Sequence, residues 1–194
     1  MKKKFKTLFK SGGDWNNDAM LNFQEDMSHG YIEGYKRAAD ILVKHVGETG
    51  YDKDYLVYPI VFLYRHHIEL MLKSIIGSGN KYLTGEFKFE QVHDLKRLWD
   101  RVKKISHEIF GEDQVGFSFI THIVSELDSV DPKSMNFRYH IDKKCKAPNP
   151  DLKCINVRHF AAVITEAILI LDGACSAIDY EIESRNEYLS DRRR

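Results

Sequence analysis

The chain has 194 residues, of which 43% are hydrophobic and 30% are charged. These proportions are typical of a globular domain with its own core and exclude an intrinsically disordered chain. Lys and Arg together number 29, as do Asp and Glu, so no overall basic field indicates nucleic-acid binding and any such contact has to be local. The three cysteines have no metal-ligand spacing, and we expect a reducing, cytoplasmic location.

The two ends of the chain differ in composition from its middle. The expected parts are a basic arm and lead-in at 1–29, a single helical-bundle domain at 30–182, and a charged helix end and tail at 183–194. No apolar run of signal-peptide length follows the basic start. We expect no membrane-spanning segment, because the most apolar window, 160–171, is interrupted by Thr165 and Glu166. That window predicts a core helix instead.

Apolar residues recur at helical spacing in several stretches. The pattern predicts helices at 30–46, 58–76, 94–109, 113–127 and 155–188, and a short one within 14–27. Gly47 and Gly77 are expected to end the first two long helices. Residues 128–151 contain three of the four prolines, and their central part, 134–141, alternates in a way that permits a short strand. The alternation of Phe87 and Phe89 with charges permits another strand. The sequence therefore predicts an all-α, up-and-down bundle of five or six helices with a short irregular or extended excursion near 130–150.

A polar face interrupts the otherwise apolar helix at 58–76. Arg65, Glu69 and Lys73 recur at intervals of four residues, with His66 beside them. Buried charge is costly unless it is paired. Two interpretations stay open: an internal ion network in which Glu69 bridges Arg65 and Lys73, or a cleft whose cations hold a phosphate or carboxylate while His66 moves a proton.

Two further groups are candidates for the same site. Arg138, Tyr139 and His140 lie in the proline-flanked excursion, where an alternating strand would send Arg138 and His140 to one side. The alternative is that Arg138 caps a helix end or pairs with a residue such as Asp131. His93 either only precedes Asp94, a suitable helix N-cap, or brings a further imidazole to the cleft.

These residues give an expected site without a metal ion or cofactor. The expected catalytic residues are Arg65, His66, Arg138 and His140. The expected ligand-binding residues are Glu69, Lys73, His93 and Tyr139. His66 and Glu69 have the spacing of half a bundle-type carboxylate metal site, but the second motif is missing, and there is no Gly-rich phosphate loop.

Three short motifs resemble a known group of proteins. They are YRHHIELMLK at 64–73, then His93-x-Leu-x-x-Leu-Trp99, and then Phe137-Arg-Tyr139 before the last helix. Over roughly 30–180 the chain resembles uncharacterised bacterial proteins of the HEPN-like helical-bundle superfamily. The resemblance implies an all-α domain that often dimerises and that occurs in anti-phage and toxin–antitoxin systems. Many such domains are metal-independent ribonucleases with an Arg followed four to six residues later by a His.

The chain departs from that ribonuclease motif. Its only pair with this spacing is Arg101 and His107, which lie inside an ordinary amphipathic helix. If the protein cuts RNA, we expect a rearranged site in which His66 or His140 is the general base and Arg65 and Arg138 stabilise the transition state. The alternative is a non-catalytic module that binds a nucleotide, a nucleic acid or a protein partner and forms a homodimer, without contact to a membrane.

Overall fold

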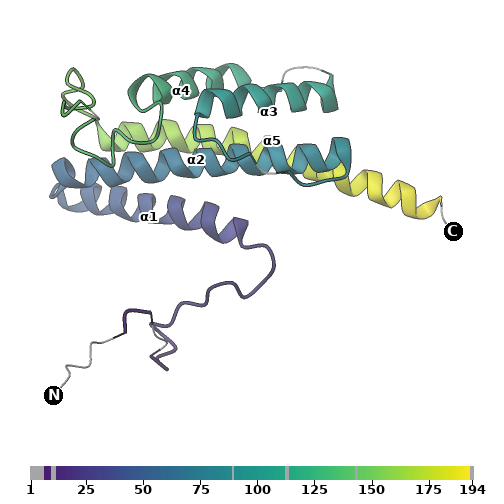
Figure 1. Cartoon of the computed structure of the whole chain (residues 1–194), viewed down its shortest axis with the longest axis horizontal. Helices are drawn as coiled ribbons and strands as arrows, with labels where there is room; N and C mark the ends of the chain where they lie inside the picture. The colour runs from purple at the N-terminus through teal and green to yellow at the C-terminus, as the bar shows by residue number, and fades with distance from the viewer. Residues whose placement is uncertain (1–6, 10–11, 89, 112–113, 143, 193–194) are drawn as a thin grey trace.

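A computed structural model describes residues 7–9, 12–88, 90–111, 114–142 and 144–192 (Figure 1). The all-α prediction is confirmed: the described residues form five helices, and none of them lies in a strand. The helices are α1 (Ser28–Thr49), α2 (Lys53–Thr84), α3 (Leu95–Phe110), α4 (Phe117–Val130) and α5 (Val157–Asp191).

Helix α2 is the centre of the bundle. It packs against α1, α3 and α5, while α4 closes the bundle by contacting α3 and α5 (Figure 1). The link between α1 and α2 is so short that the two helices run antiparallel, and its turn uses positive φ angles at Gly50 (70°) and Asp52 (59°). Because partners surround it, α2 buries most of its residues, charged ones included.

The sequence pattern predicted that Gly77 would end α2, but it does not. The helix continues to Thr84 and ends before Gly85. A Cβ atom at Gly77 would lie 2.3 Å from the ring of Phe87, so the missing side chain makes room for the segment that returns along α2. Gly79 has the same role toward α3, because a Cβ there would lie 2.2 Å from Cγ2 of Ile105. These glycines are packing positions inside a helix and not a stop signal.

The other boundaries follow the predictions closely at α3 and less closely elsewhere. The side chain of Asp94 caps α3 by accepting a hydrogen bond of 2.9 Å from the amide of Arg97. Helix α1 ends at Gly50 and not at Gly47, and residues 14–27 contain a turn where a short helix was expected. Phe87 lies outside any strand, and Phe89 lies outside the described residues.

The excursion between α4 and α5 is irregular, and the short strand that the alternation at 134–141 permits is not formed. Oδ1 of Asp131 accepts hydrogen bonds from the amides of Met135 (2.7 Å) and Asn136 (2.9 Å). This bends the backbone into a turn, in which the amides of Arg138 and Tyr139 both donate to the carbonyl of Met135. The chain between α4 and α5 therefore folds as consecutive turns at one end of the bundle (Figure 1).

Helix α5 is the longest helix and projects beyond the bundle at its C-terminal end (Figure 1). It contains an 18-residue window of mean hydropathy 1.8, of which 33% is buried. By length and composition this helix could cross a membrane, whereas the sequence analysis expected no membrane-spanning segment. A core helix of a soluble protein meets the same criteria, and α5 packs against α1, α2 and α4. No other helix in the described part of the chain meets them.

Candidate functional site

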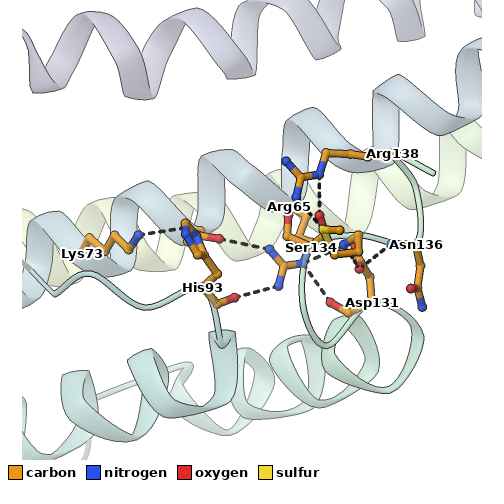
Figure 2. A network of polar contacts seen from close by, with 9 residues as sticks. Arg65, Lys73, His93, Asp131, Ser134, Asn136 and Arg138 are labelled. Carbon is orange, nitrogen blue, oxygen red and sulfur yellow. Dashed lines mark hydrogen bonds and ion pairs between the residues drawn. The ribbon is translucent and has the colours of Figure 1, made fainter. Parts of the chain in front are cut away.

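The polar face of α2 forms a buried ion network (Figure 2). Arg65 is 0% exposed. Its Nη1 donates to Oε2 of Glu69 (3.1 Å), its Nη2 to the carbonyl of His93 (3.0 Å) and its Nε to the carbonyl of Asp131 (3.1 Å). Arg65 therefore joins α2 to the segment before α3 and to the end of α4, and it lies away from solvent.

Glu69 bridges Arg65 and Lys73, as the network interpretation predicted. Its Oε1 accepts from Nζ of Lys73 (2.9 Å) and lies 2.8 Å from Nδ1 of His93. Burial opposes ionisation of Glu69, but the hydrogen bonds from Lys73 and His93 outweigh it and hold the pKa of this carboxyl below its usual value. The side chain of His93 is 68% exposed, whereas that of Lys73 is 5% exposed, so His93 carries the network to the surface.

His66 lies on a different side of α2, between two aromatic rings. Its ring meets that of Tyr35 edge-on (centroids 4.4 Å apart) and stacks on that of Phe62 (5.7 Å, interplanar angle 12°). Burial lowers the pKa of His66; the charge of Glu69 opposes this, and the nearby cations add to it. The imidazole is therefore neutral at pH 7 and can accept a proton.

Arg138 stands over the same Phe62 ring from the excursion. Its guanidinium carbon lies 5.5 Å from the Phe62 centroid and 5.6 Å from the Tyr139 centroid. Its Nε donates to the carbonyl of Ser134 (2.6 Å), which fixes the side chain over the turn (Figure 2). The alternative that Arg138 pairs with Asp131 is not observed, because Asp131 bonds the turn amides and lies 3.6 Å from Nε of Arg65.

A groove of about 550 Å³ opens beside Arg138. Charged, polar and aromatic side chains line it, among them those of Tyr58, Arg138, Tyr139, His140 and Lys153. We call this the excursion groove. Tyr58 and Tyr139 are both more than half exposed. Cations and accessible aromatic faces thus share one concave surface.

The structure divides the predicted site into two layers. Arg65, Glu69 and Lys73 lie buried, with His93 at their edge. Arg138, Tyr139 and His140 line the excursion groove, and Phe62 links Arg138 to His66.

The sequence analysis singled out neither the groove residues Tyr58 and Lys153 nor Phe62. Tyr58 is more than half exposed and Phe62 is partly exposed. The only sequence signal for them is the lysines and prolines of the excursion, which mark an irregular surface segment but do not say which part of α2 it covers.

No three His, Cys, Asp or Glu residues of the described ranges are grouped so that they could hold a metal ion. Arg101, the Arg of the ribonuclease-like spacing, donates from Nη2 to Oδ1 of Asn80 (3.1 Å), and His107 lies exposed near the end of α3.

The fold and the groove define an all-α helical bundle with an aromatic and cationic surface at one end. Compared with known proteins, the chain matches no family model, and no curated protein or solved structure matches it significantly.

Proposed function

We propose that this protein binds single-stranded RNA in the excursion groove. The observation that carries the proposal is the guanidinium of Arg138, held between the rings of Phe62 and Tyr139 at the groove edge. Proteins that bind single strands combine cations for the phosphates with aromatic faces on which bases stack. Here Arg138 and Lys153 supply the cations, His140 lies beside them, and Tyr58 and Tyr139 supply the faces.

The balanced net charge of the chain is compatible with this proposal because the cations are concentrated locally. A groove concentrates positive potential at the place where a phosphate backbone would lie. The motifs at 64–73, 93–99 and 137–139, which resemble those of HEPN-like proteins, further support RNA as the partner. A homodimer stays a prediction.

A second candidate function is metal-independent cleavage of the bound strand. It is favoured by the neutral imidazole of His66, which stacks on the same ring as Arg138. His66 would take the proton of a ribose 2′-hydroxyl, whose oxygen attacks the neighbouring phosphorus and displaces the 5′ oxygen, which takes a proton from water and leaves as a hydroxyl group. Arg138 would stabilise the charge that develops on the phosphorane oxygens. Arg65 is not assigned to this step because it does not line the excursion groove.

One experiment separates binding from cleavage. Fluorescence anisotropy of a labelled single-stranded RNA in EDTA measures affinity against salt concentration, and gels of the same samples detect cleavage. Arg138→Ala is expected to weaken binding about tenfold and to reduce the salt slope by about 0.7, the value for one phosphate contact on a single strand. The matched control is Arg37→Ala on α1, where the side chain of the arginine is 75% exposed and forms an ion pair of 3.7 Å with Glu33.

The outcomes decide between the candidates. Equal affinities for wild type, Arg138→Ala and Arg37→Ala would refute the groove as the RNA site. Binding by wild type without cleavage retains the first candidate and rejects the second. Cleavage that His66→Asn abolishes, with affinity unchanged, would establish the second.

A further inference from the structure

A second cavity shares part of its wall with the excursion groove. Its volume is about 270 Å³, it is open on one side, and it is lined by residues of α2, α4, α5 and the excursion. Phe137, Leu152 and Ile155 line both the cavity and the groove. Most of its wall is apolar, with Phe160 and Ile164 contributed by α5. A cavity of about 150 Å³ can hold benzene, so this one has room for a single heterocyclic ring.

Two buried charged residues also line the cavity, and both have unused hydrogen-bonding capacity. Asp131 is 1% exposed; its Oδ1 binds the turn amides, and its Oδ2 is buried with no hydrogen-bond partner among the described residues. The guanidinium of Arg65 has five N–H donors, of which three find acceptors within the described part of the chain. Nε of Arg65 lies 3.6 Å from Oδ2 of Asp131.

A polar pair of this kind specifies the chemistry of an occupant. Oδ2 of Asp131 has an ion pair with Arg65 but no hydrogen bond, so it can accept from an N–H donor, and the spare guanidinium N–H groups can donate to an acceptor nearby. Apolar walls with a few convergent polar groups are the usual composition of a small-molecule site. A flat heterocycle with a donor beside an acceptor on one edge satisfies both residues, and every nucleobase has such an edge.

We infer that the cavity binds one nucleobase, unstacked from a strand whose phosphates lie in the excursion groove. The inference rests on the proposed RNA binding, and it adds a base-binding site to the groove. Phe137 and Phe160 provide aromatic walls, Asp131 accepts from the base and Arg65 donates to it. Single-stranded RNA is commonly recognised in this way, through bases that are splayed out and hydrogen-bonded on an edge.

The test uses the full chain with free nucleosides, which have no phosphate and so probe the cavity alone. Calorimetric titration with uridine, cytidine, adenosine and guanosine is expected to show binding of at least one of them. Ile164→Phe, which fills the cavity, is expected to lower that affinity at least tenfold. Asp131→Asn is expected to do the same, since it retains an acceptor for the turn amides but replaces the free acceptor with a donor. Thermal melting verifies that both variants are folded.

An RNA strand with one abasic nucleotide tests whether RNA bound in the groove places a base in the cavity. RNA binding that is insensitive both to an abasic site at any position and to Ile164→Phe, with no nucleoside bound, would overturn the inference and leave the RNA proposal standing. Nucleoside binding that Ile164→Phe abolishes, in a protein that binds no RNA, would leave the cavity site standing and overturn the RNA proposal. Nucleoside affinity unchanged in both variants would also overturn the inference.

Discussion

Replacing Arg65 with alanine tests whether the charged face of α2 is structural. The substitution removes three hydrogen bonds and leaves Asp131 and Glu69 buried beside the space of the lost cation. Removing one partner of a buried ion pair costs about 3–5 kcal/mol. In a chain of this size each kcal/mol lowers the melting temperature by about 2–4 °C, so the expected drop is roughly 6–20 °C.

Thermal and urea unfolding, followed by circular dichroism, measure this drop. Arg37→Ala is the control because its exposed side chain has one long ion pair, and it should change stability by less than about 0.5 kcal/mol. If Arg65→Ala melts within about 1 °C of wild type, the reasoning about the buried network is refuted. The same result together with lost RNA binding would mean that Arg65 acts in binding and not in stability.

Two further predictions concern packing and pH. Gly77→Ala should destabilise the protein by about 1–3 kcal/mol, because the new methyl group would overlap the ring of Phe87, whereas Gly47→Ala on the open side of α1 should stabilise it by about 0.5–1 kcal/mol. Urea unfolding of both variants checks this, and equal effects would contradict the packing role. Burial lowers the pKa of His67 below its ordinary value of 6.5, despite the hydrogen bond to Ile32, so the unfolded chain binds the proton more tightly. Stability should therefore fall as the pH is lowered below about 6.5, and His67→Met should flatten that part of the pH profile; an unchanged slope would refute the assignment.

Local signals in the sequence were sufficient for the parts of the fold that depend on local chemistry. Asp94 marked the start of α3 because a cap depends only on residues a few positions away. Gly77 was misread because its meaning depends on Phe87, which approaches it only after the chain has reversed. The alternation at 134–141 permitted a strand, but Asp131, just outside that stretch, binds its amides and bends it.

Part of the candidate site could be located from the sequence, but its division into a buried and an exposed layer could not. Spacing placed Arg65, Glu69 and Lys73 on one face, and both the ion network and the cleft agreed with that spacing. Two acceptors of Arg65 are main-chain carbonyls, at His93 and Asp131, and a carbonyl has no sequence signature. The position of Arg138 over Phe62 likewise depends on where the excursion meets α2, which is a tertiary contact.

The partners of Arg65 also set an order of events during synthesis of the chain. Its carbonyl acceptors come 28 and 66 residues later, so α2 leaves the ribosome with a guanidinium that cannot yet be sequestered. The nascent helix must keep this charge in water until α3 and α4 have been made. Closure of the bundle is then a long-range step, which slows folding but makes it cooperative. Fragments that end before Asp131 should therefore remain open, and the protein should become compact only when α4 is complete.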